Sequence, residues 1–321
     1  MDYEILASEL LRTLRGKRSQ GAFSRRLGFK SNIAYAWESG RRFPTGAGMF
    51  RAALRSGVDV QAGLATFFRT PPAWLQETEL SEPAGVVRLL EELRAAARVS
   101  ELARRTGISR FALARWFNGV TEPRLPDFLA LVEATSLRLL DFLAALIDPL
   151  ELPSVAEDWR RLDAQRRLAY ELPWSQAVLL ALELQSYRGL ARHRGGWIAA
   201  RLGISEQEEL QCLQALEATG QIRLRARRWV PVNIATLDTR RDAAAGRQLK
   251  RWWARVGLDR LDADGAGQFS YNVFTVSEAD LARLQELHFN HYQEMRRIIA
   301  ASQDCERVVL TNLQLIPLDA V

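Results

Sequence analysis

An internal repeat is the feature that most constrains the fold of this 321-residue chain. At an offset of 79 residues, the aligned pairs are Arg26 and Arg105, Gly28 and Gly107, Phe29 and Ile108, Trp37 and Trp116, Gly40 and Gly119, and Pro44 and Pro123. Such a repeat indicates two copies of one structural module. We expect the copies at residues 1–70 and 84–150, separated by RTPPAWLQETELSEP, whose prolines prevent a continuous helix.

Each copy is predicted to contain five helices. Apolar residues recur at helical spacing in a leading helix, in two short helices around a glycine turn, and in two closing helices after a proline-containing loop. Hydrophobic residues make up 48% of the chain, and Leu and Ala dominate. This composition, with glycine confined largely to the turns, favours a mostly α-helical protein.

Residues 155–321 are predicted to form a separate α+β region. Its part from Gly195 to Val232 has the order helix, helix, hairpin of a winged-helix module, and Ser205 with Glu208 fits a capping box on the second helix. Further on, apolar residues alternate in FSYNVFTV (269–276) and recur in ERVVLTNLQLIPL (306–318). These two segments are predicted to be strands of a small sheet, joined by a long helix.

Positive charge is concentrated in the first copy. The whole chain carries a formal net charge of +6. From Met1 to Ser56 there are 11 Lys and Arg against 4 Asp and Glu, whereas residues 57–150 contain 10 against 12. A local excess of this kind is typical of a domain that binds a polyanion.

The first copy contains the pattern of a helix-turn-helix. A short helix from Gln20, a tight turn at Gly28 and a second short helix form the arrangement in which the second helix enters the DNA major groove. The residues expected to project from the second helix and its start are Lys30, Ser31, Asn32 and Ala36. An Asn amide can bind the N6 and N7 edge of adenine, and an Ala methyl can contact thymine.

A family pattern is formed by Gln20, Gly28, Trp37, Glu38 and Gly40. With it, roughly the first 68 residues resemble the lambda-repressor-like family of Cro/CI-type DNA-binding domains, and the second copy does so more loosely. The resemblance implies base contacts at Lys30, Ser31, Asn32 and Ala36 and DNA backbone contacts at Gln20, Ser39, Arg41 and Arg42. Trp37 is expected in the core. The alternative is that Asn32 only caps its helix.

The second copy keeps this frame but departs from the pattern at two positions, because Val99 replaces the Gln and Phe117 replaces the Glu. Its corresponding base-contacting positions are Ser109, Arg110, Phe111 and Arg115. Either arginine can bind the O6 and N7 atoms of guanine. The alternative is a repeat that only packs or dimerises.

The winged-helix-like module is a weaker candidate for DNA contact. Its second helix begins with Glu206, Glu208 and Glu209, which would face phosphates unfavourably, whereas its hairpin carries four arginines. We therefore expect a scaffold or contact role. The order of the predicted helices and strands in this C-terminal region is similar to that of a bacterial regulator family whose C-terminal domain has no assigned function. This resemblance implies no ligand.

No catalytic residue, metal site or cofactor is predicted. The sequence lacks a dinucleotide-binding glycine motif, a P-loop, a nucleophile elbow and a zincin motif. Cys212 and Cys305 lack the paired spacing of a zinc site and are expected to be ordinary packed thiols. No export signal and no membrane span are evident, so a cytoplasmic protein is expected.

Together these patterns predict a mostly α fold, with two five-helix helix-turn-helix domains followed by an α+β region that contains a winged-helix-like module and a small sheet. The predicted function is that of a sequence-specific transcriptional repressor that binds double-stranded DNA as a homodimer. Residues 155–321 are expected to dimerise or to bind a small-molecule or protein effector. The alternative is an antitoxin-like or defence-associated adaptor that binds a protein and uses DNA binding for autoregulation.

Overall fold

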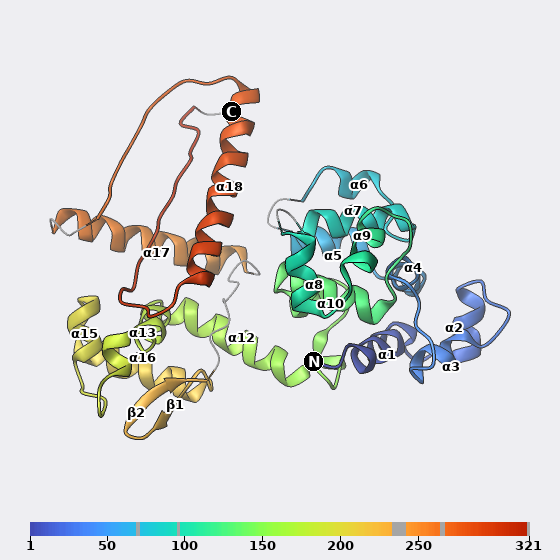
Figure 1. Cartoon of the computed structure of the whole chain (residues 1–321), viewed down its shortest axis with the longest axis horizontal. Helices are drawn as coiled ribbons and strands as arrows, with labels where there is room; N and C mark the ends of the chain where they lie inside the picture. Colours follow the sequence, from blue (N-terminus) through green and yellow to red (C-terminus); the bar gives the residue numbers. More distant parts are fainter. Residues whose placement is uncertain (69–70, 95–96, 233–241, 264–266, 320–321) are drawn as a thin grey trace. The chain divides into compact units, whose positions relative to one another are not determined.

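The protein forms two compact units, Met1–Asp163 and Ala164–Val321 (Figure 1). The computed structural model describes residues 1–68, 71–94, 97–232, 242–263 and 267–319. Both units are mostly helical, as the composition predicts. Among the described residues, no helix combines the length and the apolar character that crossing a membrane requires.

The helices of the first unit recur at the offset of the sequence repeat. Their bounds are α1 Tyr3–Arg15, α2 Gln20–Arg26, α3 Ile33–Glu38, α4 Gly46–Ser56, α5 Val60–Phe67, α6 Trp74–Glu77, α7 Pro83–Arg94, α8 Val99–Thr106, α9 Arg110–Phe117, α10 Leu125–Ser136 and α11 Leu139–Ala144. Thus α4 begins at Gly46 and α10 begins 79 residues later at Leu125. Helices α1 to α5 correspond in order to α7 to α11, and the short α6 lies in the segment between them.

Side-chain caps and a glycine explain where the helices of the first copy begin and where the chain turns between them. Four polar side chains cap α2, α3, α4 and α5 by accepting a backbone N–H of the first turn, namely those of Ser19, Asn32, Thr45 and Asp59. The turn after α2 requires a left-handed backbone at Gly28, where φ is 91°, and Gly107 occupies the same conformation after α8 with a φ of 72°. Glycine adopts this conformation without a Cβ clash, which explains its recurrence.

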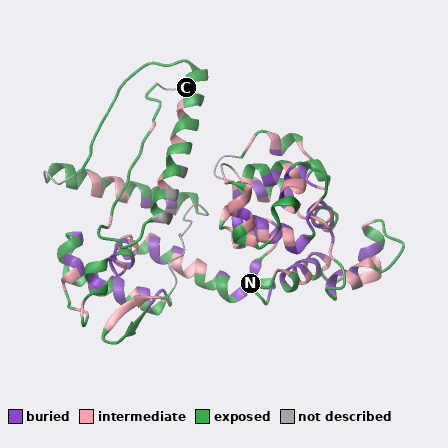
Figure 2. Ribbon diagram, viewed as in Figure 1, coloured by how far each residue is buried: buried purple, intermediate pink, exposed green. Residues whose placement is uncertain are grey.

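Both copies contribute to one hydrophobic core (Figure 2). Phe50 and Phe67 of the first copy meet Phe142 of the second copy edge to face, with ring centroids 6.2 and 5.9 Å apart. The loops before α4 and α10 also meet, because Thr45 and Arg124 form an antiparallel bridge. The two copies therefore share a single folding unit.

The second unit begins within α12, and its core lies around α13, α15 and α16. The bounds are α12 Ala156–Glu171, α13 Trp174–Ala181, α14 Gln185–Arg188, α15 Trp197–Leu202, α16 Glu206–Ala218, β1 Ile222–Arg225, β2 Arg228–Pro231, α17 Ala243–Asp262 and α18 Glu278–Ala301. Strands β1 and β2 form an antiparallel hairpin in which Ile222 lies opposite Pro231. The predicted capping box of Ser205 and Glu208 is confirmed at the start of α16.

The predicted small sheet of 269–276 and 306–318 is wrong. Both segments are described but neither forms a strand, and β1 with β2 is the only sheet in the described part of the chain. Alternating apolar residues stabilise a strand only when one face is covered. Here Tyr271 is 95% exposed and Val273 is 73% exposed, so the alternation has no apolar layer to pack on.

The two cysteines differ, which corrects the prediction for one of them. Cys212 of α16 is buried, and this burial raises the pKa of its thiol to about 11, so it stays protonated and unreactive. Cys305 is exposed rather than packed, in the segment without helix or strand that follows α18.

Glu209 of α16 forms a buried polar cluster with His193 and Tyr187. Glu209, which we expected to face outward, is 1% exposed and accepts the backbone N–H of Ala199 at 2.6 Å, which satisfies a free donor at the N-terminus of α15. Its Oε1 atom lies 3.6 Å from His193 Nε2, and His193 Nδ1 lies 3.2 Å from the Tyr187 hydroxyl. Burial raises the pKa of Glu209 and lowers the pKa of His193, so both groups are favoured in their neutral forms.

We predict that Glu209→Gln changes the pH dependence of stability. Because the folded-state pKa of Glu209 is raised, its stabilising contribution is complete at low pH and is lost as pH rises through that pKa. Gln stays neutral and keeps an acceptor for Ala199. The free energy of unfolding of the variant, relative to that of the native protein, should therefore increase as pH rises above the usual pKa of a glutamate and level off above the raised pKa of Glu209.

Urea unfolding at several pH values measures this margin, and Glu217→Gln, an exposed position on the same helix, is the control. The lowered pKa of His193 acts in the opposite direction, costing stability as pH falls, but it is present in both proteins. Parallel stability curves for the native protein and Glu209→Gln would contradict the prediction.

Candidate nucleic-acid interface

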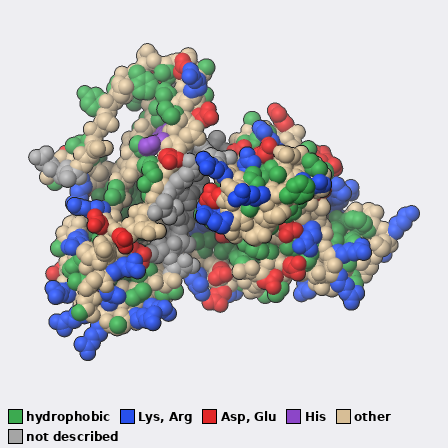
Figure 3. Space-filling view, viewed as in Figure 1, with side chains coloured by type: hydrophobic (Ala, Val, Ile, Leu, Met, Phe, Trp, Pro, Cys, Tyr) green, Lys and Arg blue, Asp and Glu red, His purple; other side chains and the backbone are tan. Residues whose placement is uncertain are grey.

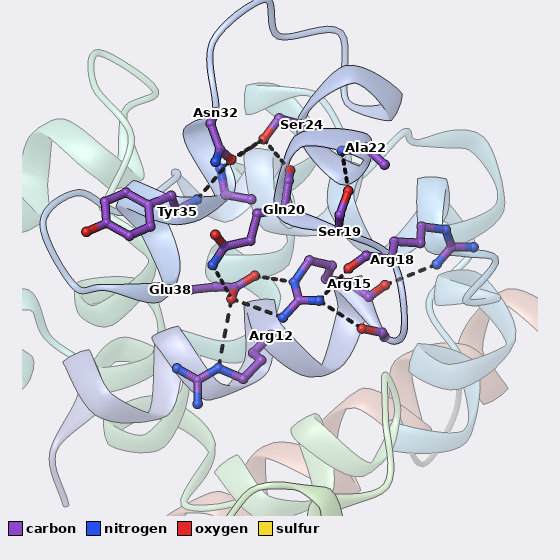
Figure 4. Close-up of polar contacts among 12 residues, drawn as sticks. Arg12, Arg15, Arg18, Ser19, Gln20, Ala22, Ser24, Asn32, Tyr35 and Glu38 are labelled. Atoms are coloured by element: carbon purple, nitrogen blue, oxygen red, sulfur yellow. Dashed lines mark hydrogen bonds and ion pairs between the residues drawn. The ribbon is translucent and has the colours of Figure 1, made fainter.

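The helix-turn-helix of the first copy is formed by α2, the turn through Gly28, and α3. Asn32 lies at the N-cap of α3 and is exposed. Its Oδ1 accepts the Tyr35 N–H at 3.4 Å and lies 3.3 Å from Ser24 Oγ (Figure 4). The same Ser24 hydroxyl lies closer, at 2.8 Å, to the Gln20 carbonyl.

These contacts leave Asn32 able to bind a base while it caps the helix. A serine hydroxyl has one hydrogen, and the shorter contact directs it to the Gln20 carbonyl. The Asn32 Oδ1 then keeps one lone pair, and within the described residues its NH₂ group donates no hydrogen bond. One acceptor and one donor on an exposed amide are what recognition of adenine requires.

Glu38 joins the three helices around this site. It is 8% exposed, and its Oε1 accepts Arg15 Nε at 2.5 Å while its Oε2 accepts Gln20 Nε2 at 2.9 Å (Figure 4). Arg12 lies 3.9 Å from the same carboxylate. The predicted phosphate contact through Gln20 must therefore use the remaining amide hydrogen, because the structure commits the other to Glu38.

In the second copy, the equivalent arginine has a different kind of contact. Arg94, which corresponds to Arg15, lies with its guanidinium 4.8 Å from the ring centroid of Phe117, and Phe117 occupies the position of Glu38. Val99, at the position of Gln20, packs against the hydrophobic core. A cation–π contact and an apolar side chain thus replace the ion pair and the amide of the first copy.

The other predicted residues of the first copy surround α3. Lys30, Ser31, Ser39, Arg41 and Arg42 are exposed, and Ala36 is half-buried. Figure 3 shows several Lys and Arg side chains over the part of the first unit that contains α2 and α3. Exposed positive charge therefore flanks α3 on both sides in sequence, the arrangement that favours phosphates.

Sequence reasoning did not include Tyr35. It lies on α3 one turn after Asn32, is 46% exposed, and has the Arg41 guanidinium 5.3 Å from its ring centroid. Its distance of three residues from Asn32 places both on one helix face, which is the signal that would have identified it.

In the second copy, α9 begins two residues earlier than α3 when the copies are aligned. Ser109 is its N-cap and accepts the Ala112 N–H at 3.1 Å, so its hydroxyl is engaged in capping. Arg110 is exposed, and Phe111 is 73% exposed with the Arg115 guanidinium 5.6 Å from its ring. The helix thus presents an arginine and an aromatic ring where the first copy presents a serine and an asparagine.

Comparison with known families identifies this helix pair. Residues 90–142 match the family model described as "Helix-turn-helix". The match lies in the second copy and not in the first, where the residue pattern predicted the stronger resemblance. The protein is therefore a DNA-binding regulator in class, with a helix-turn-helix of the lambda-repressor type.

The remaining part of the chain defines its family. Residues 155–318, more than half of the chain, match the model described as "Domain of unknown function (DUF4423)", and the protein belongs to this family. Neither the curated proteins nor the solved structures gave a match. Among the described residues, no group of three or more His, Cys, Asp and Glu side chains is placed to hold a metal ion.

We predict that Glu38→Ala destabilises the first unit by about 3 kcal/mol, because it leaves the Arg15 guanidinium poorly solvated and the Gln20 amide unpaired. Urea unfolding measures the loss. The double variant Gln20→Val with Glu38→Phe, which introduces the residues of the second copy, should lose less because Arg15 can then lie over a ring. A double variant that is less stable than Glu38→Ala would show that the ring contact of the second copy cannot replace the ion pair of the first.

We predict that Asn32→Ser separates capping from base recognition. Serine keeps an acceptor for the Tyr35 N–H, so the thermal midpoint should stay near that of the native protein. The variant lacks the amide donor and should lose about 1–3 kcal/mol of affinity for the preferred duplex and little for unrelated duplexes. Fluorescence anisotropy with both duplexes tests this, and equal losses would assign Asn32 to capping alone.

Proposed function

We propose that the protein is a sequence-specific transcriptional regulator whose two copies are both helix-turn-helix domains. The observation that carries the proposal is the exposed Asn32 at the N-cap of α3, whose amide retains a donor and an acceptor. Lys30, Arg41 and Arg42, which flank α3 in sequence, are exposed as well. The equivalent α9 adds exposed Arg110 in the copy that matches the helix-turn-helix model. Repression follows most simply if the bound protein occupies a promoter.

Dimerisation through the second unit is the finer part of the proposal. Many of its exposed apolar side chains lie on α18 and on the two segments without helix or strand beside it in sequence, including Leu287, Ile298, Ile299, Val309 and Leu318. Single exposed apolar residues are common, but a concentration within one region is typical of an interface. Sedimentation of the full-length protein, with and without Ile298→Asp and Ile299→Asp, tests this role.

The principal experiment is the selection of bound sequences from random duplexes by the full-length protein. Enrichment of one motif supports sequence-specific binding, and a fusion of that motif to a promoter then distinguishes repression from activation. An adaptor that binds only a protein would enrich no motif, so this result would remove the proposal.

We predict that Arg41→Ala and Arg42→Ala weaken binding to every duplex by a similar factor. Each removes one charge from the loop after α3, and each should reduce the slope of log affinity against log salt by about one unit. Arg160→Ala is the control, because it removes an exposed arginine of α12 in the same unit. An unchanged salt slope would place Arg41 and Arg42 away from the DNA.

A further inference from the structure

The two copies meet through backbone groups that exchange roles. The Gly46 N–H donates to the Pro123 carbonyl at 3.4 Å, and the Leu125 N–H donates to the Pro44 carbonyl at 2.8 Å. Gly46 corresponds to Leu125 and Pro44 to Pro123 at the repeat offset. The second bond is thus the first with the copies interchanged, which is the signature of a twofold interface.

The packing of the helices has the same reciprocity. Helix α1 packs on α10, and its counterpart α7 packs on α4, the counterpart of α10. Helices α4 and α10, and likewise α5 and α11, pack against each other as counterparts. The α5–α11 contact is close, since a Cβ placed on Gly63 would lie 1.9 Å from the Ala145 carbonyl oxygen. A local twofold axis therefore relates the copies within one chain.

This axis places the two recognition helices on either side of the loops that meet. Helix α3 ends at Glu38 and leads to Thr45, and α9 ends at Phe117 and leads to Arg124, the partner of Thr45 in the bridge. Figure 1 shows the pair α2 and α3 at one side of the unit, away from α8. Each connecting segment can span at most about 25 Å, so a separation of about 34 Å between the helices is within reach.

We infer that one chain is the equivalent of a repressor dimer and binds both halves of one operator, an inference that rests on the proposed function. The halves are related by the twofold axis in position but differ in sequence. Asn32 in one half favours adenine, and Arg110 with Arg115 in the other favours guanine. The operator is therefore an imperfect palindrome with half-sites about one helical turn apart.

The packing of the two copies against each other allows both to contribute to affinity. Once one recognition helix is bound, the other is held at its half-site, and binding becomes intramolecular. The exposed arginines of the loop after α3, Arg41 and Arg42, add positive charge between the half-sites, whereas Arg124 of the other loop is paired with Asp127 at 3.0 Å. Phosphates at the centre of the operator are thus attracted without a base contact.

The stoichiometry of binding tests this inference. The full-length protein is titrated with the duplex recovered by selection, and the end point is measured by anisotropy at concentrations well above the dissociation constant. We expect one duplex per chain, whatever the oligomeric state set by the second unit. An end point of half a duplex per chain would overturn the inference and leave sequence-specific binding intact, whereas the absence of any enriched duplex would remove the proposed function itself.

Variants of protein and DNA locate each half. Arg110→Ala with Arg115→Ala should lower affinity about 10- to 100-fold and relax selection in one half-site, and Asn32→Ser should relax it in the other. Inserting five base pairs between the halves turns one of them to the opposite side of the duplex and should cost at least as much. If the arginine variant or the insertion leaves affinity unchanged, only one copy binds DNA, and the inference is wrong.

Discussion

The packing of one copy against the other is the constraint on which the first unit depends. A module of this size has little interior of its own, and the cluster of Phe50, Phe67 and Phe142 takes its members from both copies. The bridge between Thr45 and Arg124 fixes the loops that follow the recognition helices. Stability of the core and placement of the two candidate DNA-binding surfaces therefore have the same origin.

The two copies use different interactions to position the equivalent arginines, Arg15 and Arg94. Arg15 is neutralised by Glu38 and supported by Gln20, whereas Arg94 lies over Phe117 beside Val99. Both solutions fasten the leading helix of a copy to its recognition helix. The ion pair carries a cost for removing two charges from water, whereas the ring contact removes one and leaves the buried Arg94 Nε without a hydrogen-bond partner among the described residues. The substitutions Val99 and Phe117, which depart from the family pattern, thus keep the link between the leading helix and α9 in the second copy.

The sequence predicted the features that depend on neighbouring residues. The glycine turns, the capping box of Ser205 and Glu208, and the burial of Trp37 follow from local geometry and helical spacing. Features that depend on distant partners were missed. Alternation in 269–276 resembled a strand but has no covering layer, and the engagement of Gln20 by Glu38 needs two helices to meet.

The burial of Glu209 was missed for the same reason, since its acceptor role depends on the N-terminus of α15. The assignment of base contacts rests on side chains that are exposed and therefore leave little trace in the packing. Hydrophobic periodicity identifies what a helix buries, and it gives no direct information about what the opposite face binds.

Joining two unequal copies in one chain has a consequence for direction. A homodimer on a perfect palindrome looks the same from both ends of its site. Arg110 begins α9, whereas the corresponding residue of the first copy is Ser31, just before α3. A chain bound through both copies, as we propose, would therefore distinguish left from right along the duplex. The polypeptide leaves the first unit through α12, after the second copy. On a promoter, such a protein acquires an upstream and a downstream side.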